Sequence, residues 1–198
     1  MSISTKIAER ITPGFLKKRE LKKLFEVVAS AYGSVVPSTA GLSYPQSLTL
    51  FAKFTAMETA KASERHADIE SIRILLYQGA FDFGMNIRRQ WRISDTSGVM
   101  DVGRMLYSFL GIEFNGTSEG LIDITRCLFA DYYSPQTCRV ISSLDEGVMA
   151  GLSAGGTLVF SRRITEGFHS CRANFTPKEN PIEKSDRGGH RCWWCNCC

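Results

Sequence analysis

The sequence lacks any apolar run long enough to span a bilayer, which needs about 20 consecutive apolar residues. Residues 1–12 also lack the apolar core of a secretory signal peptide. We therefore expect a cytoplasmic protein without a membrane partner. Cysteines remain thiols in that compartment, so the seven cysteines predict metal binding, nucleophilic chemistry or modification rather than disulfides.

The middle of the chain lacks a proline-rich or low-complexity linker, and no internal repeat is visible. One domain is the expectation for 198 residues. The net charge of +4 comes partly from short basic clusters, none of which is flanked by a ladder of aromatic side chains. We therefore expect no nucleic-acid partner and interpret these clusters as solvated helix faces.

Helical spacing of apolar residues dominates the first half of the chain. It predicts four helices, over residues 15–32, 45–64, 67–91 and 97–110. We interpret the first as a lid packed on the core, because Glu20 and Glu26 dilute the basic face that a membrane-surface helix would need. Gly79 and Gly84 would let another backbone approach the third helix closely.

The pattern changes after the fourth helix. Segments rich in β-branched and aromatic residues predict three strands, over residues 119–128, 157–165 and 168–176. A helix over residues 135–151 separates the first two strands, and a tight hairpin at residues 165–167 makes the last two antiparallel. The order indicates an α+β fold, with N-terminal helices packed on a small antiparallel sheet formed by the C-terminal third.

The domain boundary follows from composition. Residues 1–176 form a single α+β domain, and residues 177–198 form a flexible linker and a cysteine-rich tail, because the linker has almost nothing to bury.

Candidate site residues follow from the alternation of side chains along strands. Alternation places Asp123 and Cys127 on one face of the first strand. On the last strand it places His169 and Cys171 together, with Arg172 opposite. If the two strands are neighbours, Cys127, His169 and Cys171 gather around one pocket.

Each of these residues also has a purely structural interpretation. A single cysteine in a strand is often a core residue, and His169 at a hairpin shoulder is often exposed. Asp145 and Glu146 on the connecting helix are commonly solvated. The coincidence of two thiols, a histidine and two carboxylates within the sheet-forming segment favours a site.

Three segments of the C-terminal third carry a resemblance to a known family. They are residues 122–131 (IDITRCLFAD), 144–146 (LDE) and 163–175 (RITEGFHSCRANF). They resemble the L-2-amino-thiazoline-4-carboxylic acid hydrolases, whose pattern is a strand ending in Cys, a helix bearing an Asp after a Cys, and a Gly-x-x-x-Cys step into a closing strand. Three residues before the Asp, where the family has Cys, this chain has Ser142, and its nearest thiol is Cys138.

The resemblance implies hydrolytic opening of a cyclic amidine such as 2-amino-thiazoline-4-carboxylate to N-carbamoyl-cysteine. That reaction needs a nucleophile or activated water, an acid for the departing thiolate and a cation for the carboxylate. The implied catalytic residues are Cys127, Cys171, His169 and Asp145, and the implied substrate contacts are Arg126, Arg172 and Asp123. Hydroxide on a divalent metal such as zinc, held by thiolates and His169, would serve as well as a thiol nucleophile, and the sequence leaves both routes open.

The last nine residues, HRCWWCNCC, hold four of the seven cysteines and directly follow Gly188 and Gly189. The Cys192-x-x-Cys195 spacing is that of zinc ligands, so the predicted metal set is Cys192, Cys195, Cys197 and Cys198. The tail is alternatively a thiol-rich core peptide released after the double glycine, with the folded domain as a leader for peptide-modifying enzymes, or an incidental extension. We rank the hydrolase first, with a peptide precursor or a metal-binding protein as alternatives.

Overall fold

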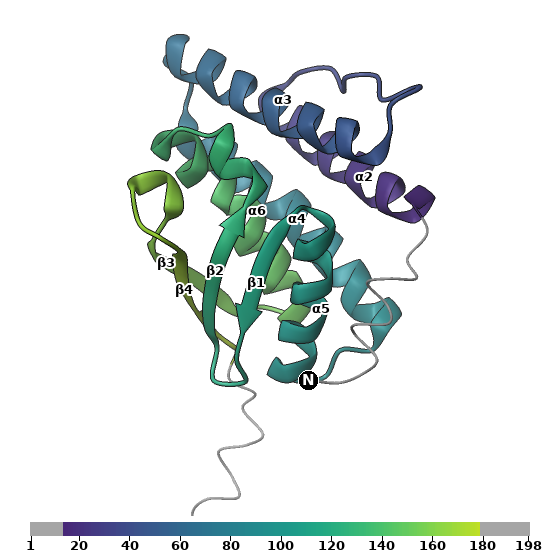
Figure 1. Cartoon of the computed structure of the whole chain (residues 1–198), viewed down its shortest axis with the longest axis vertical. Helices are drawn as coiled ribbons and strands as arrows, with labels where there is room; N and C mark the ends of the chain where they lie inside the picture. Colours follow the sequence, from purple (N-terminus) through teal and green to yellow (C-terminus); the bar gives the residue numbers. More distant parts are fainter. Residues whose placement is uncertain (1–13, 179–198) are drawn as a thin grey trace, which may run out of the picture.

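A four-stranded antiparallel sheet from the C-terminal part of the chain lies against helices that come mainly from the N-terminal part (Figure 1). The computed structural model describes residues 14–178. The helices are α2 (Gly14–Tyr32), α3 (Tyr44–Glu64), α4 (Ile69–Trp91), α5 (Thr96–Phe109) and α6 (Pro135–Ser153). The strands are β1 (Ile112–Gly116), β2 (Leu121–Cys127), β3 (Thr157–Arg162) and β4 (Cys171–Thr176), with 3-10 turns η1 (Leu128–Asp131) and η2 (Ile164–Glu166). The predicted α+β class is confirmed.

Polar side chains cap the N-termini of the central helices. Ser43 accepts a hydrogen bond from the backbone N–H of Gln46, whose side chain accepts one from the backbone of Ser43, and this reciprocal pair starts α3. Asp68 and Ser134 cap α4 and α6, each with a side-chain oxygen that accepts a hydrogen bond from a backbone N–H of the first turn. α2 packs on this framework through buried Leu21, Phe25 and Val28, among others, which confirms its packing on the core.

The sheet has the order β1-β2-β4-β3, and every neighbouring pair is antiparallel. The sequence analysis missed β1, because its five residues, IEFNG, contain only one β-branched side chain and a terminal glycine. It also wrongly predicted a tight hairpin between the last two strands. The η2 turn ends at Gly167, whose φ of +92° suits glycine, and β4 begins at Cys171 rather than at residue 168.

The backbones of α4 and α6 touch at small residues. A Cβ atom at Gly84 would lie 2.5 Å from the carbonyl oxygen of Val148, and one at Gly151 would lie 2.3 Å from that of Phe81. The expected close approach at Gly84 is therefore confirmed, whereas Gly79 accommodates the side chain of Val27 from α2. This contact fixes α6, the helix that carries Asp145, between α4 and the sheet (Figure 1).

One face of the sheet is buried and the other is solvated. Ile122, Ile124, Leu158, Ala173 and Phe175 belong to the core, while alternate residues of the same strands are exposed. No helix within residues 14–178 combines the length and the apolar character needed to cross a bilayer.

Candidate functional site

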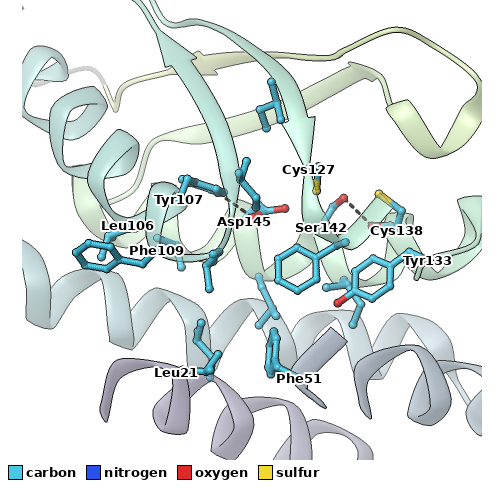
Figure 2. Close-up of a pocket in the computed structure, with 18 of the residues that line it drawn as sticks. Leu21, Phe51, Leu106, Tyr107, Phe109, Cys127, Tyr133, Cys138, Ser142 and Asp145 are labelled. Carbon is cyan, nitrogen blue, oxygen red and sulfur yellow. Dashed lines mark hydrogen bonds between the residues drawn. The ribbon is translucent and has the colours of Figure 1, made fainter. Parts of the chain in front are cut away.

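An apolar cavity of about 120 Å³ lies between the helices and the buried face of the sheet (Figure 2). Its apolar wall includes Leu21, Phe51, Leu106, Phe109, Ile124 and Phe129. The polar groups at its wall include Asp145, Arg163, Ser142 and three cysteines. Because a cavity of about 150 Å³ holds one benzene molecule, this cavity suits a ligand of about one small ring.

Asp145 and Glu20 are the two carboxyl residues that line the cavity, and the pKa of Asp145 is shifted. The hydroxyl of Tyr107 on α5 donates a hydrogen bond of 2.8 Å to its Oδ1 (Figure 2), and the Tyr107 ring stacks on Phe114 at 4.9 Å. Burial raises the pKa of Asp145 to about 7, and the hydrogen bond from Tyr107 only partly opposes this rise. Asp145 lines the cavity, so a group able to gain or lose a proton near neutral pH lies at the cavity wall.

Cys127, Cys138 and Cys171 also line the cavity. Burial raises the pKa of all three thiols, that of Cys127 to about 12, and the negative charge of Asp145 adds to the effect. The backbone N–H of Ile164 lies 3.3 Å from the sulfur of Cys171 and donates a hydrogen bond to it. At neutral pH the cysteines are therefore thiols rather than thiolates.

The structure brings Cys127, Cys171 and Asp145 to one cavity, as the sequence analysis predicted. The face predicted for Cys127 was nevertheless wrong. Phe114 pairs with Ile124 but Glu113 pairs with Arg126, so Thr125 is an extra residue that forms a bulge in β2. The bulge shifts the alternation by one residue and turns Cys127 to the inner face.

His169 does not line the cavity, contrary to the predicted cluster. It lies exposed in the connection after Gly167, which is not a strand, so strand alternation does not apply to it. His169 therefore does not face the thiols across this cavity.

The three expected substrate contacts also lie away from the cavity. Arg126 has a side chain 74% exposed that pairs with Glu113 at 3.1 Å. Arg172 approaches Asp123 to 4.0 Å, and Asp123 accepts a hydrogen bond of 2.8 Å from Ser170. All three belong to the solvated side of the sheet, as alternation had already indicated for Arg172.

Arg163 is the cavity residue that sequence reasoning missed. Its side chain is only 14% exposed and lies over the ring of Phe160 at 4.8 Å. A bulge at Ser161 in β3 shifts the alternation, so Arg163 falls on the same side as Phe160. Arg162 and Arg163 form one of the short basic clusters that were interpreted above as solvated helix faces, and alternation alone gives no signal of the bulge.

Within residues 14–178, no three His, Cys, Asp or Glu side chains group so that they could hold a metal ion. The predicted metal ligands Cys192, Cys195, Cys197 and Cys198 fall outside the described residues, as do residues 179–198 of the expected linker and tail. A zinc site there therefore stays a prediction.

Comparison with known proteins gives no relative. The chain matches no protein-family model, no curated protein and no solved structure. The support for a function therefore comes from the chemistry of the cavity.

Proposed function

We propose that the protein is a hydrolase that opens a small cyclic amidine of the 2-amino-thiazoline-4-carboxylate type in this cavity. The observation that carries the proposal is Asp145, a carboxyl that lines a mainly apolar cavity and whose pKa burial raises to about 7. A general acid or base works best when its pKa lies near the operating pH. Functional sites are also where such shifted groups concentrate.

In the proposed reaction Asp145 first accepts a proton and then donates it. Its carboxylate takes a proton from water as the water oxygen forms a bond to the ring carbon between nitrogen and sulfur. The bond from that carbon to sulfur then breaks, and the protonated Asp145 gives its proton to the departing sulfur. The second proton of the water moves from the new hydroxyl to the ring nitrogen, so that the attacked carbon becomes a urea carbonyl. One water is added overall, and the sulfur leaves as a thiol.

The raised pKa values of the three thiols favour water, rather than a cysteine, as the nucleophile. A cysteine attacks as its thiolate, and burial opposes thiolate formation at Cys127, Cys138 and Cys171 alike. We therefore assign Cys127 and Cys171 to the polarizable wall around the ring rather than to covalent catalysis. The aromatic side chains around them exclude bulk water and strengthen the interactions of Asp145 with a bound ring.

Ring opening by cysteine variants tests the proposed function. We expect the purified protein to open 2-amino-thiazoline-4-carboxylate, and Cys127→Ser and Cys171→Ser each to keep turnover within about tenfold, because Asp145 and water remain. The measurement is product formation followed by mass spectrometry, with Cys138→Ser as the matched variant on α6 and circular dichroism as the folding check. Absence of ring opening by the wild-type protein contradicts the function. A loss above about a thousandfold in one folded cysteine variant contradicts the water route and identifies a nucleophile.

A further inference from the structure

Arg163 holds a fixed position at the wall of the cavity. Its Nε donates a hydrogen bond of 3.4 Å to the hydroxyl of Ser142 on α6, and its guanidinium lies over the ring of Phe160. Its side chain is nearly buried. Both supporting residues also line the cavity, so the guanidinium is held where a ligand would bind.

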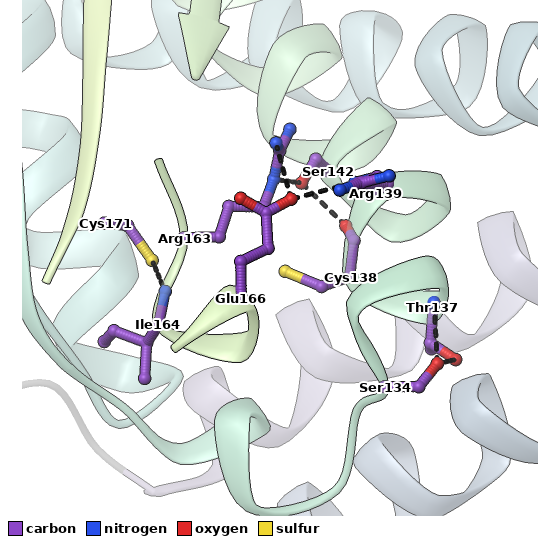
Figure 3. A network of polar contacts seen from close by, with 9 residues as sticks. All are labelled: Ser134, Thr137, Cys138, Arg139, Ser142, Arg163, Ile164, Glu166 and Cys171. Carbon is purple, nitrogen blue, oxygen red and sulfur yellow. Dashed lines mark hydrogen bonds and ion pairs between the residues drawn. The ribbon is translucent and has the colours of Figure 1, made fainter. Parts of the chain in front are cut away.

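The charge of Arg163 is only partly balanced. Its Nη1 lies 3.8 Å from Oε1 of Glu166, whereas the Nε of Arg139 lies 2.8 Å from that same oxygen (Figure 3). Hydrogen-bonded ion pairs have distances of about 2.7–2.9 Å, so Glu166 is engaged by Arg139. Within residues 14–178, no oxygen accepts a hydrogen bond from Nη1 or Nη2 of Arg163.

The remaining carboxyl groups near Arg163 do not neutralise it fully. Asp145 is protonated in part near neutral pH because burial raises its pKa to about 7. Glu146 lies 3.8 Å from Arg73 on α4. Burial raises the pKa of Asp145, Cys138 and Cys171, and the positive charge of Arg163 partly opposes the rise in each, so Arg163 lies near the proton-transferring group.

We propose that Arg163 binds the anionic group of the ligand through its two terminal nitrogens, and that the cavity therefore selects small rings bearing a carboxylate. A planar guanidinium matches a carboxylate with two parallel hydrogen bonds. The other cation of the wall, Lys17 on α2, is half-buried, and its ammonium lies over the ring of Phe109 on α5. This assignment rests on the proposed function for the identity of the ring, but not for the binding of an anion.

Binding of two ring ligands tests the assignment without any turnover. The probes are thiazole-4-carboxylate and the uncharged thiazole-4-carboxamide, titrated calorimetrically into the full chain. We expect the wild-type protein to bind the carboxylate at least about tenfold more tightly than the carboxamide. Arg163→Gln should remove this preference and leave carboxamide binding within about threefold.

Two further variants separate anion binding from a structural role of Arg163. Glu166→Gln removes the negative charge that partly balances Arg163 and should increase the preference for the carboxylate ligand, which loss of folding would not do. Arg172→Gln on the solvated side of the sheet is the control and should leave both affinities unchanged. Thermal unfolding of each variant shows whether it is folded.

The outcomes separate this inference from the proposed function. Equal binding of the two ligands to the wild-type protein, binding of neither, or a preference that survives in Arg163→Gln overturns the assignment. Ring opening without a carboxylate preference would contradict the assignment alone. A carboxylate preference without ring opening would contradict the proposed function and leave the assignment standing.

Discussion

Replacement of Asp145 by asparagine is expected to lower the kcat/KM for ring opening by about 10²- to 10⁴-fold, the range that a positioned general acid or base contributes. Asparagine keeps the volume and can still accept the hydrogen bond from Tyr107, but it cannot carry a proton. In the wild-type protein kcat/KM should rise with pH as Asp145 ionises and level off above about 7, because the carboxylate is the form that accepts the proton from water. The residual activity of the variant should lack this rise.

The matched control is Asp82→Asn, which changes an exposed carboxyl on α4. It should keep both the rate and the pH profile of the wild-type protein. Wild-type activity in Asp145→Asn, or a profile that falls as pH rises through 7, would show that Asp145 is not the base.

The same substitution is expected to stabilise the fold at alkaline pH. The pKa of Asp145 is about 7 in the folded protein and near its ordinary value of 3.8 in the unfolded chain. Below pH 3.8 Asp145 is protonated in both the folded and the unfolded state, so the pKa shift does not change the free energy of unfolding. Between the two values the unfolded state ionises first, so the folded state loses stability, and above about 7 the full penalty of about 4 kcal/mol is present.

Asparagine has no charge to desolvate, so Asp145→Asn should raise the free energy of unfolding by up to about 4 kcal/mol at pH 8 and by less at pH 5. Urea denaturation of both proteins at the two pH values measures the difference, again with Asp82→Asn as the control. A variant that gains stability but loses activity shows that the carboxyl is kept for function at the expense of the fold. An equal or lower stability of the variant at pH 8 would contradict the desolvation of Asp145.

The sequence was sufficient to predict most of the fold, because its helices follow the apolar spacing and begin at polar caps such as Ser43 and Ser134. The short strand β1 was missed because its composition resembles that of a loop. Local pattern also could not reveal the η2 turn, which depends on the positive φ of Gly167 and on the pairing of the strands on either side.

The candidate site was predictable only in part. Asp145 and Cys171 were found from the resemblance and from alternation, but alternation assumes a regular strand. The bulges at Thr125 and Ser161 break that assumption and turn Cys127 and Arg163 inward. A bulge is set by pairing with a neighbouring strand, so a single sequence gives no direct sign of it. Arg126 was assigned to the pocket from the resemblance, and His169 from a strand that begins only at Cys171; neither residue lines the cavity.

Titration of Asp145 by carbon NMR tests the central claim most directly. The protein is labelled with ¹³C at aspartate side-chain carboxyls, and the Asp145→Asn variant identifies the resonance. The account predicts a midpoint of about 7 for this carboxyl, because its burial outweighs the hydrogen bond from Tyr107. A midpoint near the ordinary value of 3.8 would contradict it, since Asp145 would then be a much weaker base, poorly matched to taking a proton from water at neutral pH.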